Sequence, residues 1–173
     1  MIKYDLLVIG FGKAGKTLAA TLGNEGKKVA VVEESSEMYG GTCINIGCIP
    51  TKTLIVAADN KKDFKEAKAT RDTVVSKLNA KNFAMLDNNP NIDVYTASAK
   101  FVSNKVVEIS IDGETKKLEG DIVVINTGAK NNVLPIPGLT TSKNVYDSTQ
   151  FQKLESTPKT LGIIGGGNIG IEF

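Results

Sequence analysis

The sequence contains no histidine and only two cysteines among its 173 residues. Without histidine, the chain lacks the side chain that most often acts as an acid–base group near neutral pH and as a metal ligand. Two cysteines are too few for the disulfide framework of a small secreted domain. With no histidine beside them, they also argue against a zinc site. We therefore expect no resident metal ion.

Long apolar runs and an excess of one charge are also missing. No segment approaches the roughly 18 apolar residues of a membrane-spanning helix, and the formal net charge is only +2. These absences argue against a membrane or a nucleic acid as a partner. The first residues, MIKYD, enter an apolar strand directly and lack the layout of a signal peptide. We therefore expect a cytoplasmic protein, and its length suits one domain or slightly more.

The first 33 residues follow the pattern of a strand, a turn, a helix and a second strand. Apolar runs predict the strands, because strands of a parallel sheet are buried on both faces. On the helix, Leu18, Ala19 and Leu22 are expected on one side. The expected elements are a strand at residues 4–9, the turn GFGKAG at 10–15, a helix at 14–24 and a strand at 28–33. This order is typical of a dinucleotide-binding unit.

Each glycine of this turn has a physical role in binding a dinucleotide. Gly10 makes the tight turn, Gly12 lets a pyrophosphate approach the backbone, and Gly15 lets the helix pack close to the sheet. The pyrophosphate rests on the helix N-terminus, and Glu33, at the end of the second strand, can accept hydrogen bonds from ribose hydroxyls. A glycine-rich turn without a ligand is the alternative, but the surrounding strands and helix favour a dinucleotide site.

Both cysteines lie in the segment GGTCINIGCIPTK at residues 40–52. In a regular helix, Cα atoms five residues apart are about 8.6 Å from each other, whereas a disulfide tolerates at most about 7 Å. A bond between Cys43 and Cys48 therefore requires a break in the helix, for which Gly47 supplies the freedom. Pro50 is expected early in the next helix, which places Cys48 at a helix N-terminus that favours a thiolate. Two buried cysteines near a tight turn are the alternative.

This segment resembles the redox-active disulfide segment of the class I pyridine nucleotide–disulfide oxidoreductases, which include dihydrolipoamide dehydrogenase, glutathione reductase and mercuric reductase. Its glycines, threonine, cysteines, asparagine, proline and lysine fall at the family spacing. The resemblance covers essentially the whole chain, and within the family it is greatest to bacterial flavoproteins of reactive-chlorine resistance. It implies a redox-active disulfide between Cys43 and Cys48, with Cys48 against the flavin and Cys43 facing the substrate.

The resemblance also implies which other residues bind cofactors. It assigns the first glycine fingerprint and Glu33 to FAD, and the second fingerprint, after an expected strand at residues 160–164, to NAD(P)H. For Lys52, implied to lie beside the flavin ring, an ordinary solvated helix lysine is the alternative. The implied cofactor-binding residues are Gly10, Gly12, Gly15, Glu33, Gly41, Thr42, Lys52, Ala99 (through its backbone, facing the adenine), Thr127 and Gly128, together with Gly165, Gly167 and Gly170.

The expected fold is α/β: a Rossmann-like FAD-binding domain, with a parallel sheet and an inserted β-meander, followed by the start of a second dinucleotide-binding domain. We expect the FAD-binding domain over residues 1–150 and the start of the NAD(P)H-binding domain over 151–173. Asp112 and Gly113 predict a hairpin turn. The remaining expected elements are helices at 51–58 and 62–86, meander strands at 93–96, 99–102, 105–111 and 115–118, and a strand at 121–126.

By resemblance, the function is that of an FAD-dependent oxidoreductase. Electrons are expected to pass from NAD(P)H through FAD to the disulfide, and on to a small-molecule or metal-ion acceptor such as a disulfide or Cu(II), in a homodimer. The alternative is a non-catalytic dinucleotide-binding fragment of such an enzyme; a flavodoxin-like carrier fits poorly with two fingerprints. Because the chain stops at Phe173, three residues after the second fingerprint, we expect these 173 residues alone to be inactive as a reductase.

Overall fold

The computed structural model of the protein describes residues 1–173 and divides them into two compact units. Unit 1 consists of residues 1–45 and 76–128, and unit 2 of residues 46–75 and 129–173. The expected α/β class is confirmed, since helices alternate with strands along the first part of the chain. No helix combines the length and the apolar character needed to cross a membrane. The predicted division at residue 150 stays a prediction.

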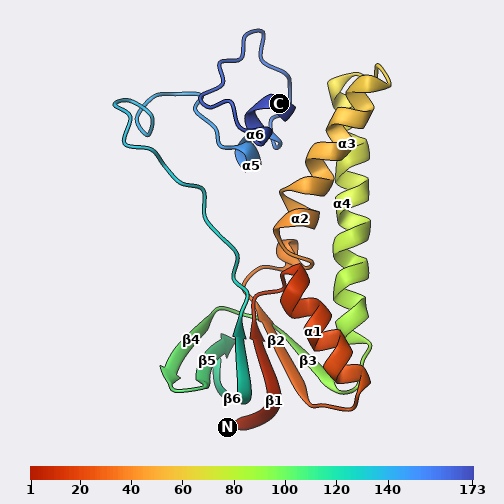
Figure 1. Ribbon diagram of the computed structural model, residues 1–173, viewed down its shortest axis with the longest axis vertical. Helices are drawn as coiled ribbons and strands as arrows, with labels where there is room; N and C mark the ends of the chain where they lie inside the picture. The colour runs from red at the N-terminus through yellow and green to blue at the C-terminus, as the bar shows by residue number, and fades with distance from the viewer. The chain divides into compact units, whose positions relative to one another are not determined.

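Unit 1 is built on one six-stranded sheet with the strand order β3-β2-β1-β6-β5-β4 (Figure 1). Its first four strands run parallel, and the last two join the sheet antiparallel. The strands are β1 (Ile2–Ile9), β2 (Val29–Glu33), β3 (Ile92–Thr96), β4 (Ala99–Ser103), β5 (Val106–Ile111) and β6 (Glu114–Ile125). The parallel part is the Rossmann-like core that the sequence predicted.

Strand β6 corrects the prediction of two separate strands at 115–118 and 121–126. It is continuous, because its first half pairs antiparallel with β5 and its second half pairs parallel with β1. Gly120 lies between the two halves, where a Cβ atom would come within 2.7 Å of the Leu7 Cβ. A glycine there looks like a loop in the sequence, but it allows the close passage of β6 along β1.

Strand β3 corrects a second prediction, which placed residues 93–96 in the meander. It pairs parallel with β2, with Val29 opposite Ile92 and Glu33 opposite Thr96, so it is the third strand of the Rossmann-like core. The meander consists of β4, β5 and the first half of β6. Its predicted hairpin turn is confirmed: Asp112 and Gly113 have φ angles of 51° and 82°, as a type I′ turn requires.

The core of unit 1 lies on both faces of the sheet. Helix α1 (Lys13–Asn24) packs on one face through small residues one turn apart, namely Gly15, Ala19 and Gly23. Leu18, which the sequence placed on the same side of the helix as Ala19, is 39% exposed. The face with the small residues packs on the sheet because only residues of this size let the helix axis come close to the strands. Unit 1 also contains the 3-10 turn η1 (Ser36–Met38) and helix α2 (Thr42–Asn45).

Unit 2 is helical and contains no strand. The strand expected at 160–164 is not formed, and Leu161, Ile163 and Ile164 are 44%, 49% and 71% exposed. An extended segment needs a neighbouring strand for its backbone hydrogen bonds, and none is present in unit 2. The helices are α3 (Cys48–Asp59), α5 (Ser148–Phe151) and α6 (Asn168–Glu172); α4 (Phe64–Asp87) contributes residues to both units.

Candidate functional site

Three strands of unit 1 end together at the first glycine turn. The N–H of Gly10 donates to Val32 O over 2.7 Å, and the N–H of Asn126 donates to Ile9 O over 2.7 Å. Gly10 has a φ of +98°, and a Cβ atom there would lie 2.3 Å from the carbonyl oxygen of Asn126. Only glycine fits this position. The carboxyl ends of β1, β2 and β6 therefore meet where ligands bind in open α/β sheets.

The N-terminus of α1 opens from this turn without a cap. Gly12 is the N-cap residue, no side chain accepts a hydrogen bond from the first turn, and no acidic residue lies in that turn. The first N–H groups of a helix have no partner within the helix, and the helix dipole makes this end positive. An anionic group such as a pyrophosphate can satisfy both features.

Lys16 adds a partly buried positive charge to the same helix. Its ammonium group donates a hydrogen bond to the Asn82 side-chain oxygen. Burial lowers the pKa of Lys16, and the charge of Lys13 lowers it further. Burial removes water from the ammonium group, and Lys13 repels it as a like charge, so both effects disfavour the charged form. The start of α1 is thus suited to an anion by its backbone and by its lysines.

Three glycine-containing segments of unit 1 approach one another beside this helix start. Gly41, with a φ of +78°, lies so close to Gly12 that its Cβ atom would be 2.7 Å from the Gly12 Cα. Gly128, with a φ of +75°, would place a Cβ atom 3.6 Å from the Thr42 Oγ1. The Cα of Thr127 lies 3.0 Å from the Cβ position of Gly10. The structure therefore brings together the predicted residues of all three segments.

Glu33 ends β2, as predicted, and its carboxylate already has two backbone partners. Its Oε2 accepts from the Phe11 N–H over 2.8 Å, and its Oε1 accepts from the Ser35 N–H over 3.1 Å. A carboxylate offers about four acceptor positions, so capacity remains for ribose hydroxyls. The sequence did not reveal that Glu33 also holds the glycine turn in place.

Ala99 lies at the start of β4, paired with Ile109. Two residues earlier, the Ala97 N–H donates to Glu33 O over 2.8 Å, so this segment begins at the end of β2. Ala99 is half-buried and packs against the hydrophobic core. Its predicted contact with adenine stays a prediction.

Asn126, the last residue before the Thr127–Gly128 segment, was not among the predicted site residues. Its side-chain nitrogen is buried without a hydrogen-bond partner, next to the positions where Gly12 and Gly15 would carry a Cβ atom. The available signal was a polar residue at the carboxyl end of an apolar strand. In parallel sheets that is where functional side chains gather.

The cysteine segment contains the helix break that a bond between Cys43 and Cys48 would require. Helix α2 ends at Asn45 and α3 begins at Cys48, leaving Ile46 and Gly47 outside both helices. Pro50 is the third residue of α3, as expected. Cys43 is half-buried and Cys48 is exposed. Their pairing and their catalytic roles stay predictions.

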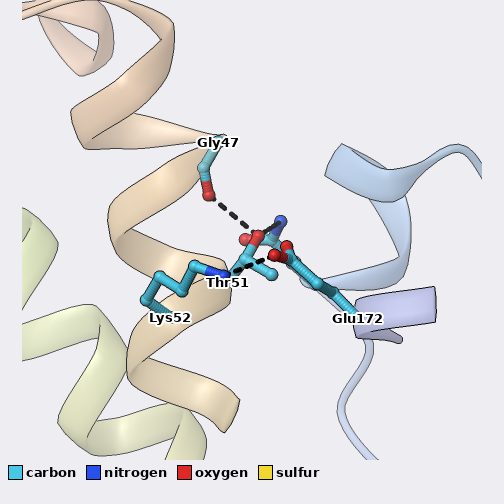
Figure 2. A network of polar contacts seen from close by, with 5 residues as sticks. Gly47, Thr51, Lys52 and Glu172 are labelled. Atoms are coloured by element: carbon cyan, nitrogen blue, oxygen red, sulfur yellow. Dashed lines mark hydrogen bonds and ion pairs between the residues drawn. The ribbon is translucent and has the colours of Figure 1, made fainter. Parts of the chain in front are cut away.

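A polar network in unit 2 holds the start of α3 (Figure 2). The Thr51 hydroxyl donates to the Gly47 carbonyl over 2.8 Å. Gln152, which is 3% exposed, donates through its Nε2 to the Ile46 carbonyl over 3.4 Å and to the Thr51 Oγ1 over 3.3 Å. Both carbonyls of the helix break therefore have partners. No local pattern in the sequence points to Gln152, because its partners lie 101 and 106 residues away.

Lys52 lies in the same part of unit 2 and pairs with Glu172 of α6 (Figure 2). Its side chain is 61% exposed. Exposed ion pairs contribute about 0–1 kcal/mol, so this contact leaves Lys52 available for another partner. Its predicted position beside a flavin ring stays a prediction.

The second fingerprint forms a tight turn of its own. Gly167 is the N-cap of α6, and Gly165 has a φ of +112°. A Cβ atom on Gly170 would lie 2.4 Å from the Gly165 carbonyl oxygen, so glycine is required there. These three glycines therefore lie together, but at a helix of only five residues.

No group of three or more histidine, cysteine, aspartate or glutamate side chains in residues 1–173 is arranged to hold a metal ion. The candidate site of unit 1 consists of a cradle of backbone N–H groups, the Glu33 carboxylate and the Cys43 thiol, and unit 2 contains the Cys48 thiol. These groups can hold a dinucleotide and can exchange electrons through sulfur.

Known proteins are similar to this chain in sequence and in fold. The chain is 50% identical over 173 residues to the probable pyridine nucleotide-disulfide oxidoreductase RclA of Escherichia coli K12, covering 100% of the chain and 39% of that protein. It is 33% identical over 193 residues to dihydrolipoyl dehydrogenase of Mycoplasma pneumoniae, covering 99% of the chain and 41% of that protein.

A solved structure, the Cu(II) complex of the HOCl-induced flavoprotein disulfide reductase RclA from Escherichia coli, superposes with a TM-score of 0.95 at 50% identity. The match covers 99% of the chain and 39% of that structure, so the chain spans about two fifths of the length of these relatives. Residues 4–173 match the pyridine nucleotide-disulphide oxidoreductase family. The expectation from the cysteine segment and the glycine fingerprint is thus confirmed, and the chain belongs to this family.

Proposed function

We propose that the chain is the FAD-binding, disulfide-carrying part of an NAD(P)H-dependent flavoprotein disulfide reductase. One observation carries this proposal: Gly10, Gly12, Gly41 and Gly128 converge on the uncapped N-terminus of α1 at the carboxyl ends of three parallel strands. That geometry fits a dinucleotide. The family membership and the two cysteines directly after the site make FAD the dinucleotide of choice.

Each residue of the cradle has a proposed task. The N–H groups from Gly12 to Gly15 bind the pyrophosphate, and Glu33 accepts hydrogen bonds from the adenosine ribose with its remaining lone pairs. Gly41 and Thr42 line the phosphates and the ribityl chain, while Thr127 and Gly128 close the site from the other side. The backbone of Ala99 faces the adenine. Bound FAD supplies the electron transfer between a nicotinamide cofactor and sulfur.

The two cysteines divide the thiol chemistry between them. Cys48 is the first residue of α3, and it is the thiol that lies against the flavin. Cys43 is the thiol that exchanges with the substrate. Reduction of the disulfide by NAD(P)H consumes two electrons and one additional proton and yields NAD(P)⁺ and two thiols. The pair is reoxidised when it passes two electrons to an acceptor.

The acceptor is proposed to be a small oxidant: a disulfide, which takes both electrons, or two Cu(II) ions, which take one each and become Cu(I). The Cu(II) option is supported by the relative whose structure is a Cu(II) complex. The same proposal places Lys52 beside the flavin and makes the Gly165–Gly170 turn a nicotinamide-cofactor site. It also includes a homodimer and a cytoplasmic location.

A chain that binds the dinucleotide without catalysing turnover is the second candidate. The exposed and irregular segment at 160–164 favours it, since a nicotinamide-cofactor site in this family is built on a strand at that position. FAD binding is expected under both proposals, whereas NAD(P)H turnover separates them.

The test measures cofactor binding and thiol state together. The purified protein is titrated with FAD while the flavin fluorescence is followed, and its thiols are alkylated with and without a reductant and weighed by mass spectrometry. We expect saturable FAD binding, and alkylation of both cysteines only after reduction. Cys43→Ser and Cys48→Ser should each leave one cysteine that reacts without reductant. Two freely alkylated cysteines under oxidising conditions, or no saturable FAD binding, would overturn the proposal.

A further inference from the structure

Asn126 stands at the carboxyl end of β6 with its backbone fixed on both sides. Its N–H donates to the Ile9 carbonyl over 2.7 Å. Its own carbonyl oxygen lies 2.3 Å from the position of a Cβ atom on Gly10. The main chain of Asn126 is therefore held between β1 and Gly10, and this placement sets the direction in which the side chain leaves β6.

The side-chain amide occupies the space that two fingerprint glycines leave open. The Nδ2 atom lies 2.6 Å from the position of a Cβ atom on Gly12 and 2.8 Å from that on Gly15. Any side chain at either glycine would collide with this amide. Gly12 and Gly15 thus make room for Asn126 as well as for a ligand, and Asn126 lies directly against the first turn of α1.

The amide nitrogen is buried there without a hydrogen-bond partner. A buried donor without a partner costs about 1–3 kcal/mol in the folded protein. A residue of similar packing volume without a donor would avoid this cost. The chain therefore carries an unused N–H donor at the end of the helix that favours anions.

We propose that Asn126 is a cofactor-binding residue that donates a hydrogen bond to the pyrophosphate of the bound dinucleotide. This inference rests on the proposed FAD site. The terminal torsion of asparagine is broad and roughly two-fold, so rotation by half a turn brings the NH₂ group to the other side of the side chain. Asn126 as a whole is half-buried, so it lies between the core and the open side of the turn. The ligand thereby satisfies the donor that the ligand-free protein leaves without a partner.

The test uses the opposite signs of two effects. Asn126→Ala removes the unsatisfied donor, so the urea midpoint without FAD should stay unchanged or rise. The same variant should lose FAD affinity by about tenfold or more, as expected for a hydrogen bond to a charged acceptor. Asn126→Asp, equal in size but negatively charged, should lose more affinity. Asn126→Ser keeps a small donor and should retain part of the FAD affinity. ADP, which keeps the pyrophosphate, should show the same order of variants.

Asn104→Ala, at the exposed β4–β5 turn, serves as a control and should change neither quantity. Wild-type FAD affinity in Asn126→Ala would show that Asn126 only fills space, and it would leave the proposed FAD site standing. If Asn126→Ala fails to fold, wild-type affinity in Asn126→Asp would overturn the inference in the same way. Absence of FAD binding by the wild-type protein would overturn both the inference and the proposed function.

Discussion

Glu33 accepts hydrogen bonds from two backbone N–H groups of its own unit, those of Phe11 and Ser35. The first of these belongs to the glycine turn, so the carboxylate ties the end of β2 to the turn after β1. Its role is therefore structural before any ligand arrives. The structural role and the proposed ribose-binding role can be separated by mutation. A ribose hydroxyl needs only one acceptor oxygen, whereas the N–H groups of Phe11 and Ser35 use both oxygens of the carboxylate.

Replacement of Glu33 by alanine should weaken FAD binding by about 1–3 kcal/mol, the usual effect of losing hydrogen bonds to a charged group. It should also lower the urea midpoint of the ligand-free protein, because the Phe11 N–H loses its partner. Fluorescence titration and urea unfolding measure the two effects. Glu33→Gln, which keeps one acceptor oxygen, should lie between the wild type and Glu33→Ala in both. Unchanged FAD affinity in Glu33→Ala would contradict the assignment.

Tyr4 is the second residue whose polar group is tied to its surroundings. It is 3% exposed, its hydroxyl donates to the Asp93 Oδ2 over 2.7 Å, and the Tyr95 hydroxyl lies 2.6 Å away. Burial, followed by the hydrogen bonds to Tyr95 and Asp93, raises the pKa of Tyr4 above its ordinary value of 10.0. The folded protein therefore resists loss of this proton more than the unfolded chain does.

The pH dependence of stability follows from this raised pKa. Well below pH 10.0 the tyrosine is protonated in both states, so its contribution to stability is complete. As the pH approaches and passes this value, the unfolded chain releases the proton first, and the contribution declines as the pH rises toward the folded pKa. The urea midpoint of the wild type should thus fall between about pH 9 and pH 11.5, more steeply than that of Tyr4→Phe.

The matched control for Tyr4→Phe is Tyr146→Phe, since Tyr146 is 44% exposed. This variant should retain the wild-type slope. At neutral pH, Tyr4→Phe should lose about 1–2 kcal/mol of unfolding free energy, because Asp93 and Tyr95 each lose a partner. Equal alkaline slopes for the wild type and Tyr4→Phe would show that the Tyr4 proton is not linked to unfolding.

At the scale of elements, α1 and the sheet are matched by small residues. Gly15, Ala19 and Gly23 form the buried face of the helix, and each has the core of the sheet directly beneath it. A Cβ atom on Gly15 would lie 2.6 Å from the Val8 Cγ1, and Val8 is fully buried. Close packing at this contact positions the N-terminus of α1 over the strand ends.

Gly15→Ala sets two effects against each other. Alanine gains about 1 kcal/mol over glycine in helix propensity, but overpacking of a buried contact costs about 1–3 kcal/mol. We expect the clash to win, because neither Val8 nor the helix backbone has room to retreat, and the urea midpoint should fall. Gly162→Ala is the control, since nothing lies within 4 Å of its Cβ position. A rise in stability for Gly15→Ala would show that the contact can relax.

The start of helix α3 depends on a hydrogen-bond partner that is distant in the sequence. The break before it is held by Thr51 and by Gln152, whose side chain reaches the Ile46 carbonyl. The residues that order the cysteine segment therefore come from the helix itself and from a segment about a hundred residues later. The helix break before Cys48 is therefore defined by these hydrogen bonds as much as by the local sequence.

At the scale of the whole molecule, the two units carry different parts of the proposed chemistry. Unit 1 contains the dinucleotide cradle and Cys43, and unit 2 contains Cys48, Lys52 and the second fingerprint. The two fingerprints differ in the segment that precedes each of them. The first follows a buried strand, whereas the second follows the exposed segment at residues 160–164.

We expect the 173-residue protein, saturated with FAD, to oxidise NADH and NADPH far more slowly than a full-length relative. The reason is that the Gly165–Gly170 turn lacks the strand that aligns such a turn with its cofactor. The assay follows absorbance of the reduced nicotinamide with a disulfide, a quinone or Cu(II) as acceptor, and the FAD titration serves as its control for cofactor loading. Turnover near that of a full-length relative would contradict this prediction.

Much of the candidate site could be predicted from short stretches of sequence. The turn after β1 needs glycine for local steric reasons, and Glu33 follows at the end of the next apolar run. A break between Cys43 and Cys48 could also be predicted as a condition for their bond, because helical spacing holds the two Cα atoms too far apart. These features depend on residues within one supersecondary unit, and the structure contains the turn, the strand end and the break.

Other features depended on pairing between distant segments. Gly120 looked like a boundary, yet β6 continues through it because β1 and β5 supply hydrogen bonds along its length. Leu18 and Leu22 are the large apolar residues of α1, yet the helix packs on the sheet through Gly15, Ala19 and Gly23. Residues 93–96 looked like a meander strand, yet they pair with β2. In each case the deciding interaction joins residues that no local pattern connects.

The sequence by itself determined the family, the α/β class, the first glycine turn and the position of the acid at the end of β2. Only the tertiary structure decided that Asn126 lies against Gly12 and Gly15 with an unused donor, and that Gln152 holds the helix break. The physical reason is distance along the chain: Asn126 is more than a hundred residues from the turn it packs against. Such a contact exists only once the parallel strands have brought their carboxyl ends together.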